Sequence, residues 1–219
     1  MKTKIYINAN VDEFKIENSI DCISEQRCAQ ILRIHDERER KLSVMAYELL
    51  QDVLYDEFHI YEPPVFDYLP GGKPVMRDLP DIHFNLSHCK GGAACIAGDK
   101  PVGIDIETKR PFKESLAHYI FADEDYDMIK NSKNPDEMFT KLWTVKEAVG
   151  KMLGTGLNGS MKKPVCMEDS EAGWKVWTLV LPKCFSGWLY LDELEQLAES
   201  KKSFNHKDKL FLSICQSVK

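Results

Sequence analysis

The amino-acid sequence predicts an α+β fold from the order of its helical and extended patterns. Apolar residues recur at helical spacing within residues 24–58 and again within 136–153. Short apolar runs bounded by glycine, proline and polar residues, typical of strands, lie between these segments and after the second. The order helix, strand pair, helix, strands is that of an α+β protein. With 219 residues, 43% of them hydrophobic, the chain can bury a sizeable core as one large domain or two small ones.

The N-terminal part is predicted to contain a short strand and then mostly helix. Residues 4–8 (KIYIN) have a strand pattern, and residues 24–58 place Leu42, Met45 and Leu49 on one side of a helix. Prolines and glycines then interrupt the pattern between Pro63 and Pro74, which indicates an irregular stretch able to carry a ligand loop. The next regular element is HFNLSH at 83–88.

The C-terminal part is predicted to contain a hairpin, a long helix and further strands. Residues 93–107 form two apolar stretches separated by Gly98-Asp99-Lys100-Pro101, which indicates a hairpin. Residues 136–153 carry Met138, Leu142 and Val149 on one helical face. Strands are predicted at 174–181 and 184–191, and a polar stretch precedes a last strand at 210–215.

Composition excludes several classes of protein. The net charge of −6 argues against bulk nucleic-acid binding, which needs a basic face. The seven cysteines include no CxxC pair, so we interpret them as unpaired thiols of a reducing compartment. The N-terminus has no signal-peptide pattern, and no run approaches the roughly 20 apolar residues that cross a bilayer. We therefore expect a cytoplasmic protein.

Two acidic residues in GIDIE are candidates for a cation site. Asp105 and Glu107 are two residues apart in a predicted strand, so their carboxylates share one face while Ile104 and Ile106 occupy the other. Two adjacent carboxylates repel each other unless a cation lies between them. A solvated polar face of a half-buried sheet is the alternative explanation.

The predicted helix at 136–153 carries a second set of charged residues. Glu147 and Lys151 are four residues apart opposite the apolar stripe, with Trp143 one turn earlier on the same side. An exposed Glu–Lys pair explains the two charges but not the tryptophan. If this face instead meets GIDIE, three carboxylates converge with Lys146 and Lys151. That oxygen-rich set suits Mg²⁺ and a phosphate substrate, which predicts phosphoryl-group chemistry.

Four motifs in this order resemble the signature of the Sfp-type 4′-phosphopantetheinyl transferase family. They are GGKP (71–74), FNLSH (84–88), GIDIE (103–107) and WTVKEAVGK (143–151). The resemblance spans residues 71–157 and implies a pseudo-twofold monomer of two similar α+β subdomains, each a small antiparallel sheet packed on helices, which we place at 1–102 and 103–219. It also implies coenzyme A in the cleft between them, with Mg²⁺ at its pyrophosphate.

The resemblance further implies roles for individual residues. Asp105, Glu107 and Glu147 correspond to the metal-site acids; Lys73, Ser87, His88, Lys146 and Lys151 correspond to residues that contact coenzyme A. The family's FxxxE motif is less well kept, since Asp125 occupies its acidic position with Glu124 just before it. Arg40 and Lys41 are our candidates for binding the 3′-phosphate.

The implied reaction moves phosphopantetheine from coenzyme A to a serine of an apo acyl or peptidyl carrier protein and releases 3′,5′-ADP. Glu147 is the candidate base, either directly or through a metal-bound water, and Lys151 would stabilise or protonate the leaving group. One alternative is another Mg-dependent phosphotransferase, which the lack of a GxxxxGK[ST] or GxGxxG loop disfavours. The other is an inactive relative that binds coenzyme A or a carrier protein.

Overall fold

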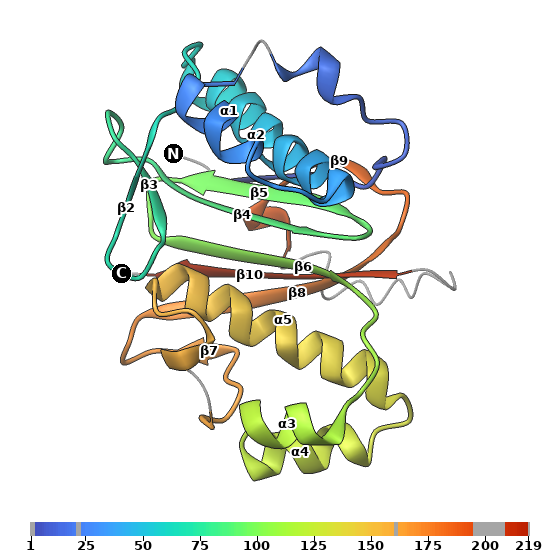
Figure 1. Cartoon of the computed structure of the whole chain (residues 1–219). Coiled ribbons are helices and arrows are strands. Elements are labelled where there is room, and N and C mark those ends of the chain that lie inside the picture. The colour runs from blue at the N-terminus through green and yellow to red at the C-terminus, as the bar shows by residue number, and fades with distance from the viewer. Residues whose placement is uncertain (1–2, 21–22, 160–161, 195–208, 219) are drawn as a thin grey trace.

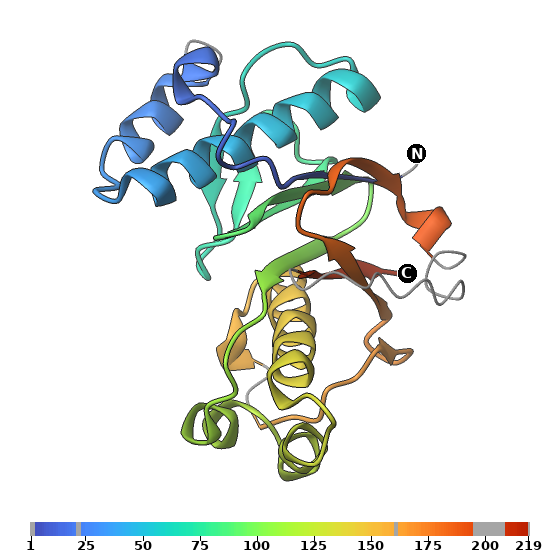
Figure 2. The ribbon, with the colours of Figure 1, turned by 90° about the vertical axis from the view of Figure 1, so that its right-hand side faces the viewer.

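The protein has four layers, in which two antiparallel sheets lie back to back and one long helix covers each outer face (Figure 1). The computed structural model describes residues 3–20, 23–159, 162–194 and 209–218. Figure 2 shows α2 (Glu37–Phe58) above the two sheets and α5 (Pro135–Leu153) below them. This arrangement confirms the predicted α+β class of small antiparallel sheets packed on helices.

The first sheet has the strand order β4-β5-β1-β9 and packs against α2. Its strands are β1 (Lys4–Asn8), β4 (His83–Cys89), β5 (Gly92–Gly98) and β9 (Ser186–Tyr190). The helical stretch predicted at 24–58 forms two helices, because Ser24 caps α1 (Glu25–Ile31) and Asp36 caps α2. A short 3₁₀ turn, η1 (Ile16–Asn18), precedes them.

The second sheet has the order β6-β10-β8-β7 and packs against α5. Its strands are β6 (Val102–Thr108), β7 (Glu168–Asp169), β8 (Trp174–Pro182) and β10 (Lys209–Ser217). Two helices that the sequence reading missed, α3 (Glu114–Ile120) and α4 (Asp123–Lys130), pack on the N-terminal part of α5 through Phe121 and Phe139. The remaining 3₁₀ turns are η3 (Leu157–Gly159) and η4 (Leu191–Glu193).

Alternation along the strands divides the apolar residues between separate cores. Ile5 and Ile7 point to the core between the two sheets, whereas Tyr6 points to the core under α2. Ile104 and Ile106 of β6 also point to the central core. Asp105 is therefore directed away from that core, toward α5, as the strand pattern of GIDIE predicts.

The hairpin predicted at 93–107 is wrong. β5 already pairs with β4 on one side and with β1 on the other, so it has no free edge for β6. After Pro101 the chain crosses into the second sheet, where β6 pairs with β10. A turn signal between two apolar runs cannot distinguish a hairpin from a crossing between sheets.

Other predicted strands are confirmed, and two short strands that were not predicted are present. The strands at 4–8, 83–88 and 210–215 are present as β1, β4 and β10, and the irregular stretch contains a small hairpin of β2 (Phe66–Tyr68) and β3 (Pro74–Met76). The strands predicted at 174–181 and 184–191 are β8 and β9, but they lie in different sheets. The polar stretch before the last strand, residues 195–208, lies outside the described residues.

The division predicted between residues 102 and 103 falls at the start of β6, where the chain enters the second sheet. β9 nevertheless returns from the C-terminal part to pair with β1 in the first sheet. A strand of the C-terminal part thus belongs to the sheet of the N-terminal part. The assignment of the two parts as separate domains stays a prediction. Within the described residues, no helix is both long and apolar enough to span a membrane.

Candidate active site

The candidate site is built at the junction of two edge strands, β4 and β6. Side chains of β4 take the place of a partner strand: Asn85 Oδ1 accepts the backbone N–H of Ile104 at 2.9 Å, and Ser87 Oγ accepts that of Ile106 at 3.3 Å. Because Asn85 and Ser87 are two residues apart, both side chains leave β4 on the same face. The FNLSH motif therefore attaches the first sheet to the edge of the second.

Close packing of α5 on β6 brings the two charged motifs together. A Cβ atom on Gly103 would lie 2.1 Å from the carbonyl oxygen of Ala148 and 2.5 Å from the backbone nitrogen of Met152. Only glycine permits this approach. The glycine of GIDIE thus sets the distance between Asp105 and the helix that carries Glu147 and Lys151.

Asp105 is the buried centre of the site. Lys151 Nζ donates to its Oδ1 at 2.7 Å and also to Ser87 Oγ at 3.0 Å and the carbonyl oxygen of Ile104 at 3.1 Å. Ser87 Oγ donates to the same Oδ1 at 2.9 Å. The other carboxylate oxygen, Oδ2, is buried and has no hydrogen-bond partner among the described residues. An orphaned carboxylate oxygen of this kind is an open ligand position.

Glu107 lies two residues further on the same face of β6. Arg110 Nη1 donates to its Oε1 at 3.0 Å. Burial raises the pKa of the Glu107 carboxyl to about 7, and Asp105 adds to this effect, while Arg110 and Lys151 oppose it. The positive charges of Arg110 and Lys151 therefore do not fully balance the carboxylates of the site. This imbalance favours a bound cation.

Glu147 faces the same site from α5. Burial raises the pKa of its carboxyl, and the charge of Asp105 raises it further, against the opposing effects of Lys151 and Arg110. A carboxylate with a raised pKa is a stronger base than an exposed one. Such perturbed groups are characteristic of functional sites.

These side chains line a single open cavity of about 380 Å³, whose walls are Leu86, Ser87, His88, Asp105, Glu107, Arg110, Trp143, Glu147 and Lys151. The convergence predicted for the two carboxylates of GIDIE with Glu147 and Lys151 is present. The explanation of Glu147 and Lys151 as an exposed ion pair is wrong, because Lys151 pairs with Asp105 on the opposite strand.

A divalent cation fits the donor set. Among the described residues, no three acidic, histidine or cysteine side chains are close enough to enclose a metal by themselves. Mg²⁺ does not need such a cage, since it usually takes one or two protein carboxylates and completes its shell with water and substrate phosphate. The free Oδ2 of Asp105 beside Glu107 and Glu147 meets that requirement.

Lys146 and Lys73 do not join this cluster. Lys146 Nζ donates to the carbonyl oxygen of Lys163 at 2.5 Å and borders a different, mostly apolar cavity beside Trp174. The predicted convergence of Lys146 is therefore wrong, since it lies one residue, about 100°, around the helix from Glu147. Lys73 Nζ donates to the carbonyl oxygen of Met152 at 2.7 Å in an adjoining pocket that also contains Lys151. A contact of either lysine with coenzyme A stays a prediction.

Arg40 and Lys41 are also outside the cavity. Arg40 donates to the carbonyl oxygen of Ile34, and Lys41 to that of Asp12 at 3.4 Å. Asp125 is buried and accepts the backbone N–H of Val165 at 2.8 Å, a structural contact, while Glu124 is exposed. The structure gives these four residues no place among the residues that line the site.

Arg27 is a candidate phosphate-binding residue that the sequence analysis missed. Its guanidinium donates to Ser43 Oγ at 2.7 Å, leaves Nε buried without a partner, and forms no ion pair with any described carboxylate. Burial lowers the pKa of His88; Glu39 and Asp105 oppose this effect, while Lys151 and Arg27 add to it. No periodic pattern marks it, because its position depends on α1 packing against α2.

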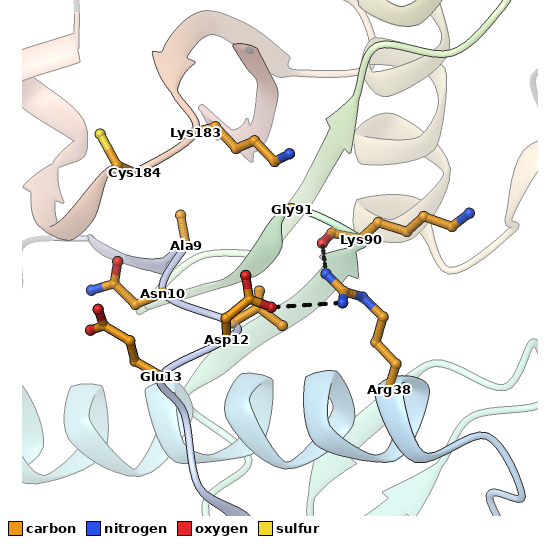
Figure 3. Close-up of a pocket in the computed structure, with 10 residues that line it drawn as sticks. Ala9, Asn10, Asp12, Glu13, Arg38, Lys90, Gly91, Lys183 and Cys184 are labelled. Carbon is orange, nitrogen blue, oxygen red and sulfur yellow. Dashed lines mark hydrogen bonds and ion pairs between the residues drawn. The ribbon is translucent and has the colours of Figure 1, made fainter.

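A second polar pocket lies elsewhere, where the end of β1 meets the turn between β8 and β9 (Figure 3). Arg38 projects into it, donates to the carbonyl oxygen of Lys90 at 2.8 Å and pairs with Asp12 at 3.8 Å. None of its lining residues lines the candidate site. Arg38 is therefore a paired arginine outside the site.

Comparisons with known proteins agree with the motif resemblance. The model of the 4′-phosphopantetheinyl transferase superfamily matches residues 101–207. The 4′-phosphopantetheinyl transferase psf-1 of Bacillus pumilus is 30% identical over 173 residues, covering 77% of this chain and 72% of the relative. Sfp of Bacillus subtilis is 27% identical over 157 residues, covering 70% of each chain. HetI of a Nostoc species is 30% identical over 156 residues, covering 66% of this chain and 65% of the relative.

Proposed function

The chain belongs to the 4′-phosphopantetheinyl transferase superfamily, and we propose from that membership how its central cavity transfers phosphopantetheine. Its substrates are coenzyme A and a carrier protein. The hydroxyl oxygen of a carrier serine attacks the β-phosphorus of coenzyme A. The bond from that phosphorus to the bridging oxygen breaks, and 3′,5′-ADP leaves.

One observation supports this proposal above the others. Residues from β4, β6 and α5 that are far apart in the sequence meet in one cavity, and they belong to the three motifs FNLSH, GIDIE and WTVKEAVGK. The GGKP turn lines the adjoining pocket, which shares Leu86 and Lys151 with the cavity. A pyrophosphate in the cavity could thus extend its nucleotide end toward GGKP.

Glu147 is the proposed base. A serine hydroxyl is a weak nucleophile, so a group at the cavity must accept its proton as the new bond forms. Glu147 faces the cavity, and burial beside Asp105 raises its pKa toward the range in which a carboxylate accepts protons well. The proton lost from the serine would move to the Glu147 carboxylate.

Lys151 is the proposed stabiliser of the leaving group. Its ammonium is held by Asp105, Ser87 and the Ile104 carbonyl, so it is already oriented before substrate binds. A cation fixed in this way acts most strongly when charge moves to the departing oxygen. Asp105, Glu107 and Glu147 would hold Mg²⁺, which would neutralise negative charge on the pyrophosphate.

We also propose that the enzyme works as a cytoplasmic monomer. A monomer is what the motif resemblance implies. The seven cysteines, none in a CxxC pair, suit a reducing compartment. With a net charge of −6, the partner is expected to be a protein and not a nucleic acid.

The test is incubation of the protein with coenzyme A, Mg²⁺ and a panel of apo acyl and peptidyl carrier proteins, followed by intact-mass measurement. We expect one carrier at least to gain a phosphopantetheine group, and Asp105→Asn to abolish the gain while thermal unfolding stays cooperative. Binding of coenzyme A with no mass change in any carrier would instead indicate an inactive relative and overturn the proposal.

A further inference from the structure

Trp143 lies on the polar side of α5, where a tryptophan is unexpected. The guanidinium of Arg110 lies 4.2 Å from the centre of its ring, within the range of a cation–π contact. The ring also packs against Phe139 on the same helix, with centroids 6.0 Å apart. The tryptophan therefore presents a flat, fixed surface to Arg110 at the edge of the candidate site.

The backbone of Arg110 is fixed to the same helix. Its N–H donates to Thr140 Oγ1 at 2.9 Å, and the N–H of Phe112 donates to Asp136 Oδ1 at 2.8 Å. These two bonds attach the irregular segment after β6 to the first turns of α5. Arg110 is thus held at both ends, by its backbone on Thr140 and by its guanidinium on Trp143.

Arg110, held in this way, contacts one acidic residue of the candidate site. Arg110 Nη1 donates to Glu107 Oε1 at 3.0 Å, and the Glu107 side chain is only 21% exposed. Within the described part of the chain, the other carboxylate oxygen of Glu107 has no hydrogen bond to protein. One oxygen is therefore occupied and the other is left for a ligand.

We propose that Arg110, supported by Trp143, is a positioning residue that holds Glu107 in the orientation needed to bind the metal. This inference rests on the proposed function, since it assigns Glu107 a metal. Groups that orient a metal-binding carboxylate typically change metal affinity or activity when removed. The proposal also explains why an aromatic residue stands on a charged helix face, which an exposed Glu147–Lys151 pair does not.

The first measurement is metal binding without turnover. Mn²⁺ titrated into the protein in the presence of coenzyme A, but without carrier protein, reports affinity through its electron paramagnetic resonance signal. We expect Arg110→Met to raise the Mn²⁺ dissociation constant by roughly 10- to 100-fold. Trp143→Leu should weaken binding in the same direction. Arg38→Met is the matched control, because Arg38 is also paired with a carboxylate but lies outside the site, and it should bind Mn²⁺ as wild type does.

Two further variants separate positioning from other roles. Arg110→Lys keeps the charge but cannot lie flat on the indole ring, so it should recover only part of the lost affinity, whereas complete recovery would overturn the positioning role. In the Glu107→Gln background, Arg110→Met should have little additional effect. A full additional loss would mean that Arg110 acts directly on the ligand, which would also overturn the proposal.

Wild-type transfer to a carrier protein is measured alongside. If the wild type transfers phosphopantetheine and Arg110→Met binds Mn²⁺ normally, the proposed function stands and the role of Arg110 falls. If the wild type transfers nothing while the Mn²⁺ losses and their coupling to Glu107 appear as expected, the role of Arg110 stands and the proposed function falls.

Discussion

Replacing Gly103 by alanine tests the close packing on which the whole site depends. The added Cβ would lie 2.1 Å from the Ala148 carbonyl oxygen and 2.5 Å from the Met152 nitrogen, and Cβ atoms are essentially never found within 3.0 Å of such an atom. Relieving the closer of these contacts requires α5 to move away from β6 by about 1 Å. Both contacts are with backbone atoms, so no change of rotamer relieves them.

The expected result follows from which residues move with the helix. Glu147 and Lys151 lie on α5, whereas Asp105 lies on β6, so the displacement separates the two halves of the site. A misplacement of about 1 Å can lower the rate on the order of 10²-fold, and overpacking a close contact typically costs about 1–3 kcal/mol of stability. We therefore expect Gly103→Ala to stay folded, with a lower melting temperature and a much lower kcat for transfer.

The assay is single-turnover transfer to a carrier protein at saturating coenzyme A, together with thermal unfolding followed by circular dichroism. Gly91→Ala is the matched control, because the close neighbours of its Cβ would be side-chain atoms of Leu210 and Thr108 and not backbone atoms, so side-chain movement can relieve them. Wild-type turnover and stability in Gly103→Ala would show that α5 does not approach β6 so closely, and would refute the reasoning.

Three further outcomes are expected. Glu147→Gln should lower kcat on the order of 10²-fold if Glu147 accepts the serine proton, with near-normal single-turnover rates as the contrary result. Arg27→Met should weaken binding of coenzyme A more than that of dephospho-coenzyme A in calorimetric titrations, because a half-buried guanidinium without a carboxylate partner favours the extra phosphate. Equal losses for both ligands would argue against this role. Asp52→Asn should stabilise the protein at neutral pH: burial, with Glu48 and Asp56, raises the pKa of Asp52 from 3.8 to about 6, so the wild type loses stability as the pH rises through that range. The gain should be under about 1 kcal/mol, because Asp52 is only partly buried and solvent screens its interactions, and it should vanish below about pH 4. Denaturant unfolding at pH 4 and pH 7 measures it, and an equal gain at both pH values would contradict the linkage.

Local periodicity was sufficient for most of the site. Asp105 and Glu107 share a face because side chains alternate along a strand, and Glu147 and Lys151 share a face because a helix repeats every 3.6 residues. Both patterns are properties of a short segment and can be read without knowing its partner. The prediction that Lys146 lies with Glu147 was wrong by the same rule. Neighbouring residues of a helix are rotated by about 100° around its axis, and this rotation directs Lys146 toward Lys163.

The sequence by itself determined the elements and the faces of the catalytic motifs, since these depend on neighbours within a few residues. Only the tertiary structure decided which faces meet. Whether residues 93–107 form a hairpin depended on β5 having both edges already occupied by strands from elsewhere in the chain. The roles of Asn85 and Arg110 depend on hydrogen bonds to Ile104 and Thr140, 19 and 30 residues away, and such contacts leave no periodic trace in the sequence.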